Sequence, residues 1–288
     1  MSLASRPSHP ADQSLAAFDY ESKTWGAHEV RLAPTYLGAM RLKYCLEDLQ
    51  DIRGKVLEVG CGAGGMARAI KAYRPDLEVY GCDVSRQALA AAQQNPRGVN
   101  FDYGDAYDLP YDPSSFSAVV MFDVLEHLED PVATVAEIRR VLRTNGLYHL
   151  FVPCEGEPYT IHGLLRRIGW KSKEIYGGHI QQFRLSAVQE LLRTGGFTPN
   201  RWRWSGHIMN QVIDAAYFTA LSLIGRNTNT SVEGYLAAAQ PSILTSGLGA
   251  LKTFVATLSF YESVLTPWIP ASGAHIGSHK SDEGEAAR

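Results

Sequence analysis

The sequence has few cysteines, little net charge and no apolar leader. Its four cysteines form no C-x-x-C pair and no regular spacing, which argues against a zinc site or a disulfide framework. A net charge of −3 gives no reason to expect nucleic acid as a partner, since surfaces that track phosphate usually make a domain basic. The first 13 residues are rich in Ser, Pro and Ala but lack the apolar centre of a signal peptide. These absences predict a cytoplasmic protein with a disordered start.

The composition supplies material for one large core. Hydrophobic residues make up 45% of the 288 residues and charged residues 20%, which is typical of a globular protein. The length exceeds that of an average single domain, yet one α/β domain with insertions can hold the whole chain. The sequence therefore predicts a single core with additions rather than several independent domains.

A short apolar run that turns abruptly into glycines organises the chain. Residues 56–59 lead into Gly60, Gly62 and Gly64, and a helical pattern follows. A buried strand therefore feeds a helix through a glycine turn. Glycine accepts backbone angles that other residues resist, and its missing side chain lets a ligand lie against the main chain. Because the free amides of the first helical turn favour a polar or anionic group, the segment predicts a nucleotide-type site.

Acidic residues narrow the choice of nucleotide. Gly60, Gly62 and Gly65 also satisfy the G-x-G-x-x-G spacing of dinucleotide-binding proteins, but alone this pattern is weak evidence. A carboxylate at Glu58, two residues before the first glycine, would repel a pyrophosphate and suits a cationic ligand better. Asp83 ends a second expected strand, about as far downstream as a ribose-binding acid should be.

Two further strands are expected to end next to acidic residues. Apolar patterns predict strands over residues 99–103 and 116–122, which are followed by Asp105 and Asp123. Strands alternating with helices at this spacing imply a mostly parallel sheet with right-handed crossovers, and ligands in such sheets bind beyond the carboxyl ends of the strands. One acid at such a place is usually a helix cap or a solvated loop residue. Four acids at four strand ends indicate a binding site.

These residues resemble the class I S-adenosylmethionine-dependent methyltransferases, and within them the group called type 11 or 12. The similarity spans roughly residues 55–153 and continues more loosely to residue 204. It implies a Rossmann-like, doubly wound α/β sheet of seven strands, mostly parallel with an antiparallel last strand, and S-adenosylmethionine as the cofactor. In the family, the acid at Asp105 bonds the adenine amino group and the small residue at Ala106 lies against the ring. The implied cofactor-binding residues are Glu58, Gly60, Cys61, Gly62, Gly64, Asp83, Val84, Asp105, Ala106, Phe122 and Asp123.

The chain is divided accordingly into a methyltransferase core and additions. In similar methyltransferases the leading segment folds over the bound cofactor, which would bring Trp25 and Tyr36 near the site. The alternative is that these aromatic residues only pack helices onto the domain. The expected parts are a disordered tail at 1–14, a helical cap at 15–50, the core at 51–204, an apolar helical insertion at 205–273, the final strand at 274–280 and a disordered tail at 281–288.

The insertion between the last two strands is unusually apolar. Only five of the residues between Trp204 and His279 are charged. Helices are expected at 208–224 and 248–265, and the first is apolar nearly all round, so it must be buried, paired or laid into lipid. It is short for a membrane span. The insertion is therefore expected to be a lid or a homodimer contact, or alternatively a hydrophobic wall for a lipid-like acceptor or an interfacial membrane foot.

The expected reaction is methyl transfer to an oxygen of a small or lipid-like molecule. A hydroxyl acceptor must lose a proton, so a base is needed. His127 is the first candidate because its unperturbed pKa lies near 6.5, and His179, in a long segment expected to help form the acceptor pocket, is the second. The alternative for His127 is that it only caps or packs at the turn.

A divalent metal is a further hypothesis. Quinone-biosynthetic O-methyltransferases of this group carry E-x-x-E-H after the fourth strand, and this chain has the D-x-x-E-H variant formed by Asp123, Glu126 and His127. Oxygen and imidazole ligands suit magnesium, manganese or zinc. Many relatives with Glu-His here are not known to need an ion, so no metal is assigned.

Two rival functions remain open. A nicotinamide-dependent oxidoreductase would need room for a pyrophosphate beside Glu58, and the chain contains no Tyr-x-x-x-Lys pair. A cofactor-binding scaffold without turnover is also compatible with the sequence.

Overall fold

The computed structural model describes residues 29–224 and 243–281. Trp25, the expected tail at 1–14 and most of the expected tail at 281–288 lie outside the described residues. The structure therefore bears on the core, on most of the insertion and on the second half of the leading segment.

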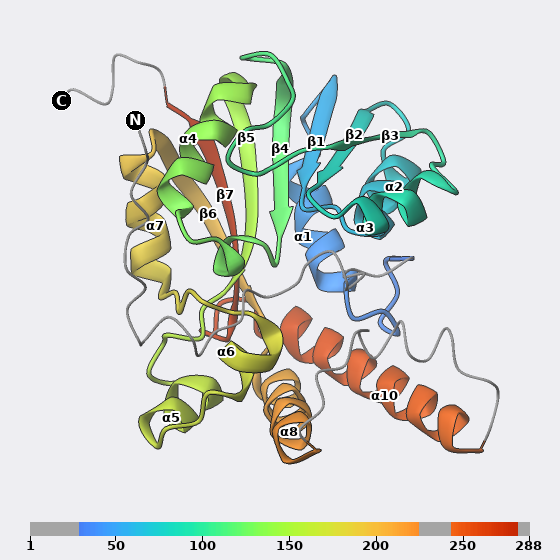
Figure 1. The fold of residues 1–288 in the computed structure, drawn as a ribbon, viewed down its shortest axis with the longest axis vertical. Helices are drawn as coiled ribbons and strands as arrows, with labels where there is room; N and C mark the ends of the chain where they lie inside the picture. The colour runs from blue at the N-terminus through green and yellow to red at the C-terminus, as the bar shows by residue number, and fades with distance from the viewer. Residues whose placement is uncertain (1–28, 225–242, 282–288) are drawn as a thin grey trace, which may run out of the picture.

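A seven-stranded sheet forms the centre of the molecule (Figure 1). Its strand order is β3-β2-β1-β4-β5-β7-β6, and all neighbours are parallel except β7, which runs antiparallel to β5 and β6. This confirms the expected doubly wound sheet with an antiparallel last strand. The strands are β1 (Lys55–Val59), β2 (Glu78–Asp83), β3 (Val99–Tyr103), β4 (Phe116–Phe122), β5 (Leu142–Pro153), β6 (Phe197–Ser205) and β7 (Gly273–Lys280).

Helices cover both faces of the sheet. Because successive side chains of a strand point to opposite faces, β4 sends Val119 and Met121 into one core and Ala118 and Val120 into the other. The first core is closed by α4 (Pro131–Val141) and α7 (Leu185–Thr194), and the second by α1 (Ala39–Asp48), α2 (Gly65–Tyr73) and α3 (Arg86–Gln93). The central strands β1 and β4 are buried on both faces, as their continuous apolar runs predict.

Further helices gather at the carboxyl edge of the parallel strands (Figure 1). Two of them come from the segment after β5 and two from the insertion between β6 and β7, and α8 contacts the other three. No helix in residues 29–224 or 243–281 is long and apolar enough to cross a membrane. These helices are α5 (Ile161–Arg167), α6 (Ser172–Gly177), α8 (Ile208–Ile224) and α10 (Ile243–Leu265).

The leading segment is less helical than expected. Its described part, residues 29–38, forms turns, and α1 begins only at Ala39. Pro34 explains part of the difference, since a proline disfavours helical angles at the residue before it. The expectation that the cap at 15–50 is helical is therefore wrong over residues 29–38.

A buried ion-pair network anchors α1 to the far strands of the sheet. Asp48, at the end of α1, lies 2.7 Å from His149 Nδ1 on β5 and 2.6 Å from Arg203 Nη2 on β6. These side chains are almost fully buried, and such pairs hold well only when both partners are present. The network fixes the direction of α1, whose preceding turns face the carboxyl edge of the sheet.

The structure adds detail to the later elements. The fifth strand begins at Leu142, and residues 143–146 bulge out of the ladder where Asn145 adopts a φ of 58°. The second insertion helix begins at Ile243 rather than residue 248. The first insertion helix, α8, spans residues 208–224 as expected.

The capping of α4 allows a direct test of local stability. Asp130 precedes Pro131 and its Oδ1 accepts a hydrogen bond from Ala133 N at 3.0 Å. Asp130→Ala is expected to lower the free energy of unfolding by about 1 kcal/mol, because an amide of the first turn loses its acceptor. Asp130→Asn keeps an oxygen acceptor and should stay within a few tenths of a kcal/mol of wild type. Urea unfolding measures both; equal losses would mean that the cap contributes nothing.

Candidate functional site

A cavity of about 750 Å³ lies at the carboxyl edge of the parallel strands. It brings together nearly all of the residues singled out in the sequence, including both histidines. Gly64, the N-cap of α2, and Glu126 do not line it. The lining residues among those predicted are Glu58, Gly60, Cys61, Gly62, Asp83, Val84, Asp105, Ala106, Phe122, Asp123, His127 and His179. Tyr36 lines the cavity as well, which agrees with the family-based expectation for the leading segment.

The glycine turn needs glycine at Gly60. Its φ is +75°, and a Cβ there would lie 2.3 Å from Val124 Cγ2 in the loop after β4. Two adjacent loops therefore touch with no room for a side chain. The backbone amide of Gly62, two residues further along the turn, donates a hydrogen bond to Asp83 Oδ2 at 2.7 Å. Asp83 Oδ1 accepts from Ser85 N at 2.9 Å, so one carboxylate joins the glycine turn to the start of α3.

Glu58 brings an uncompensated carboxyl group to the cavity. The residue is only 3% exposed, and its Oε2 has no hydrogen-bond partner among the described residues. Burial raises its pKa to about 8, although a hydrogen bond from the Ala67 amide works in the opposite direction. The carboxyl group is therefore largely protonated at neutral pH until a cation approaches it.

Asp123 adopts a left-handed backbone angle, with φ at 52°, and forms an ion pair with Arg41 of α1. Arg41 Nε lies 2.7 Å from Asp123 Oδ2, and the guanidinium group stacks 4.0 Å from the centre of the Phe151 ring. Arg41 also lines the cavity, so it offers a cation for an anionic ligand group. The sequence does not single out Arg41, because nothing local to α1 shows that this residue reaches the carboxyl edge of the sheet.

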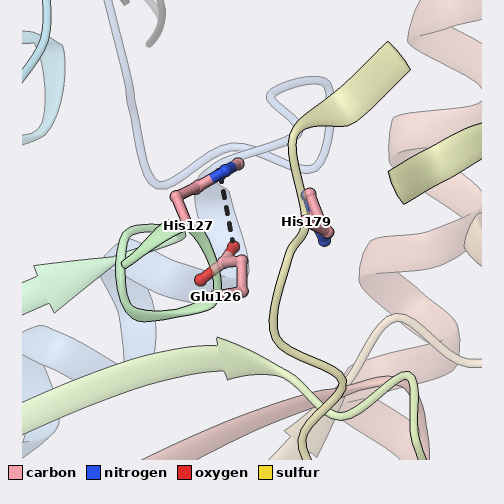
Figure 2. A group of neighbouring side chains, drawn as sticks. All are labelled: Glu126, His127 and His179. Atoms are coloured by element: carbon pink, nitrogen blue, oxygen red, sulfur yellow. Dashed lines mark ion pairs between the residues drawn. The ribbon is translucent and has the colours of Figure 1, made fainter. Parts of the chain in front are cut away.

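The D-x-x-E-H ligand set is not assembled as the resemblance suggested. Asp123 pairs with Arg41, and the potential ligand atoms within 4.8 Å of one another belong to Glu126, His127 and His179 (Figure 2). The two histidine rings meet edge to face with their centroids 4.8 Å apart. His179 thus takes the place that the sequence hypothesis gave to Asp123.

The two histidines differ in their hydrogen-bond partners. His127 Nδ1 lies 2.9 Å from the carbonyl oxygen of Gly178, so this nitrogen carries the proton. Burial, with a smaller contribution from His179, lowers the pKa of His127 to about 4. His179 Nδ1 instead lies 3.2 Å from the Oε2 atom of Glu155, a buried carboxylate two residues beyond the end of β5.

The insertion supplies the apolar half of the cavity. Side chains of α8 and α10 line the cavity from two sides, so the space between the two helices is part of the cavity. The apolar residues of these helices that line it are Ile213, Tyr217, Phe218, Leu221, Leu251, Val255, Ala256 and Phe260. The cavity therefore has a polar end at the strand tips and an apolar end within the insertion.

The polar end fits the cofactor that the resemblance implies. The unpartnered carboxyl oxygen of Glu58 suits a cation, and the glycine turn lets a ligand lie against the backbone. Asp83 and Asp105 supply acceptors at the neighbouring strand ends, and Arg41 supplies a cation. An adenosyl group with an attached amino acid has matching hydroxyl, amino and carboxylate groups.

Comparisons with known proteins agree with the fold. Residues 57–150 match the family described as Methyltransferase domain. An uncharacterised methyltransferase of Schizosaccharomyces pombe is 31% identical over 150 residues, which cover 48% of this chain and 52% of that protein. Ajmaline N-methyltransferase of Rauvolfia serpentina is 33% identical over 124 residues, 41% of this chain and 42% of that protein. The chain thus spans about half the length of these curated relatives, or less.

A solved structure shows the same fold over most of the chain. The [4+2]-cyclase SpnF aligns with a TM-score of 0.55 and 20% identity, covering 84% of this chain and 80% of that one. The names among the relatives include methyltransferases acting on nitrogen, oxygen and carbon, so the matches do not specify an acceptor atom. Together, the matching domain and the strand order show that residues 57–150 form a methyltransferase domain of the class I type, with S-adenosylmethionine as its cofactor.

Proposed function

We propose that the protein transfers a methyl group from S-adenosylmethionine to an oxygen of an amphipathic, lipid-like acceptor. The observation that carries this proposal is the continuity of one cavity from the acidic strand ends, past two histidines, to the apolar space between α8 and α10. A small polar acceptor would leave that apolar space without contacts. A molecule with a polar head and an apolar body would fill both ends.

Four charged residues of the cavity would hold the cofactor. Asp83 would accept hydrogen bonds from the ribose hydroxyl groups, and Asp105 from the adenine amino group. Arg41 would bind the carboxylate of the amino-acid part, and Glu58 would face its positive charge. The cofactor supplies an activated methyl group, so the protein mainly has to align donor and acceptor, an effect that reaches roughly 7 to 11 kcal/mol in favourable cases.

Oxygen is the proposed acceptor atom because two imidazole side chains lie next to the cofactor residues. A hydroxyl group must give up a proton during methyl transfer, and an imidazole nitrogen within reach can accept it. His127 and His179 both line the cavity between the cofactor residues and the apolar end. A tertiary amine or an activated carbon would have less need of such a base.

The source of the acceptor is proposed to be a lipid surface. The inner face of α10 lines the apolar end of the cavity, while Phe254 and Leu265 of the same helix are 63% and 68% exposed. A helix that is apolar on both faces suits the boundary of a bilayer, from which an amphipathic molecule could pass into the cavity. Flotation with phosphatidylcholine vesicles tests this contact. A protein that stays unbound to vesicles and forms a dimer in solution would instead assign the exposed face to a second copy.

Labelling from the cofactor tests the reaction itself. The protein is incubated with S-adenosylmethionine carrying a 13C-methyl group and with a total lipid extract. The expected result is label in the organic phase, with the carbon chemical shift of a methyl group bonded to oxygen. Label on nitrogen or carbon would overturn the choice of acceptor atom, and label confined to water-soluble products would overturn the lipid-like acceptor.

A matched pair of variants on α8 tests the apolar end of the cavity. Leu221 lines the cavity, whereas Leu223 on the same helix is 83% exposed and does not. Leu221→Ala is expected to lower labelling of the lipid acceptor by about tenfold, since removing apolar contacts in a pocket is worth about 1 to 3 kcal/mol. Leu223→Ala should leave it unchanged. Binding of S-adenosylhomocysteine by both variants shows that the cofactor end is intact.

A further inference from the structure

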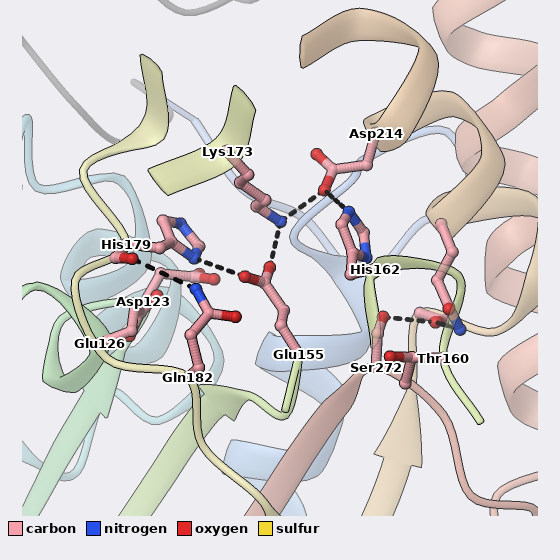
Figure 3. A network of polar contacts seen from close by, with 12 residues as sticks. Asp123, Glu126, Glu155, Thr160, His162, Lys173, His179, Gln182, Asp214 and Ser272 are labelled. Carbon is pink, nitrogen blue, oxygen red and sulfur yellow. Dashed lines mark hydrogen bonds and ion pairs between the residues drawn. The ribbon is translucent and has the colours of Figure 1, made fainter. Parts of the chain in front are cut away.

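A chain of buried polar contacts leads from His179 to the insertion (Figure 3). His179 contacts one carboxylate oxygen of Glu155, and Lys173 Nζ lies 2.5 Å from the other. Lys173 also forms an ion pair with Asp214 on α8, whose Oδ2 is 3.0 Å from His162 Nε2. Neither the sequence patterns nor the family resemblance assigned a role to the other members of this chain, which are Glu155, Lys173, Asp214 and His162.

The charges of this chain compensate one another. Burial by itself would raise the pKa of Glu155, but the Lys173 ammonium and the His179 imidazole outweigh it and lower that pKa well below its usual value. Burial likewise disfavours the charged form of Lys173, but Asp214 and Glu155 raise its pKa. Glu155 is therefore an ionised carboxylate, and Lys173 is an ammonium group.

An ionised carboxylate determines which nitrogen of His179 carries the proton. A carboxylate only accepts hydrogen bonds, so Nδ1 of His179 must be the protonated nitrogen. In the neutral ring, the other nitrogen, Nε2, then keeps its lone pair. The same carboxylate stabilises the positive charge that the ring gains when Nε2 takes up a proton. His127 Nδ1 instead donates to a backbone carbonyl, and the Glu126 carboxyl group lies 3.8 Å from its Nε2.

We infer that Glu155 is a positioning residue that presets His179 as the base for the acceptor hydroxyl, and that Lys173 determines which oxygen of Glu155 faces the ring. The inference deepens the proposed function and rests on it, since it assigns the proton of the acceptor to Nε2 of His179. It also ranks the two histidines, with His179 as the base and His127 as its neutral neighbour.

The lysine makes Glu155→Gln an unusually sharp test. An ammonium group has three donors and no acceptor, so the amide NH2 of the new glutamine cannot face Lys173. The amide oxygen must turn toward Lys173, which leaves the NH2 group facing His179. Nδ1 would then have to accept a hydrogen bond, and the ring proton would move to Nε2. The side chain keeps its size, but the lone pair toward the acceptor is lost.

The tautomer of His179 can be read directly by long-range 1H–15N NMR on the full chain with S-adenosylhomocysteine bound. The expected result is a proton on Nδ1 in wild type and on Nε2 in Glu155→Gln. Loss of a signal in His179→Asn assigns the resonance. His127 provides an internal control, since its proton should stay on Nδ1 in both proteins. Glu174→Gln is the matched control, because this acid pairs with Arg166 and not with His179.

Two outcomes would overturn the inference. A proton on Nε2 of His179 in wild type would show that Glu155 does not orient the ring, even if the variant fails to fold. An unchanged tautomer in a folded Glu155→Gln would show the same.

Methyl transfer provides a functional test of the same inference. Labelling of the lipid acceptor should fall by at least about 100-fold in Glu155→Gln, the scale of a lost base, while S-adenosylhomocysteine affinity stays within twofold. Undiminished labelling would reject His179 as the base. If wild type labels no acceptor, the proposed function fails, whereas the tautomers still decide the role of Glu155.

Discussion

Asp83→Ala is expected to weaken binding of S-adenosylhomocysteine by at least about 100-fold. Asp83 lines the cavity, and its two carboxylate oxygens accept from the amides of Gly62 and Ser85. The variant would lose the proposed hydrogen bonds to the ribose and would also release the glycine turn that forms the floor of the site. Hydrogen bonds to a charged group contribute roughly 1.5 to 3 kcal/mol each, and two of them correspond to this loss. Isothermal titration calorimetry measures it.

The matched control lies on the opposite edge of the sheet. Asp76 precedes β2, is exposed and pairs with Arg74. Asp76→Ala removes an acid close in sequence to Asp83 but should leave the affinity within about twofold of wild type. An Asp83→Ala variant that still binds the ligand with wild-type affinity would contradict the assignment of the strand ends as the cofactor site.

The acidic residues that the sequence could locate share one property: they lie at or just beyond the end of a strand. The strands β1 and β4 are recognisable from continuous apolar runs because they are buried on both faces, whereas β3 has alternating apolar residues and is buried on one face. A parallel sheet brings its carboxyl ends to one edge, so the acids that follow those strands must meet. The cofactor side of the site was therefore predictable from local patterns and one topological rule.

Glu155 is a further acidic residue near a strand end, and it was not among the predicted site residues. It stands two residues beyond β5, in the same relation to its strand as the acids of the cofactor site, and it is nearly fully buried. The same reasoning could have identified it. Its partners could not be found in this way, since Lys173 and Asp214 reach it from helices whose packing no local pattern specifies.

Arg41 and the leading segment illustrate a different limit. The apolar spacing of α1 predicted a helix, but not where it begins or which of its turns meets the cavity. That position depends on the buried contacts of Asp48 with β5 and β6, strands that lie more than 90 residues further along the chain. A sequence pattern within one helix carries no information on such distant partners.

The affinity for S-adenosylmethionine is expected to rise about 100-fold between pH 6 and pH 9 because of Glu58. Burial raises the pKa of this carboxyl group to about 8 in the free protein, so it is mostly protonated at pH 7. A cation beside it favours the ionised form and lowers that pKa in the complex. Binding then requires loss of the proton below pH 8, and affinity increases about tenfold per pH unit up to pH 8 and is level above it.

Glu58→Gln separates this effect from the titration of the ligand. The α-amino group of the cofactor has a pKa near 7.7 to 8.0 and titrates in the same range, but it does so equally for both proteins. The ratio of wild-type to variant affinity should therefore rise with pH up to about 8 and then remain constant. At pH 7, calorimetry in buffers of different ionisation enthalpy should detect close to one additional proton released by wild type. A ratio independent of pH would mean that Glu58 is already ionised in the free protein, or that no positive charge of the cofactor lies beside it.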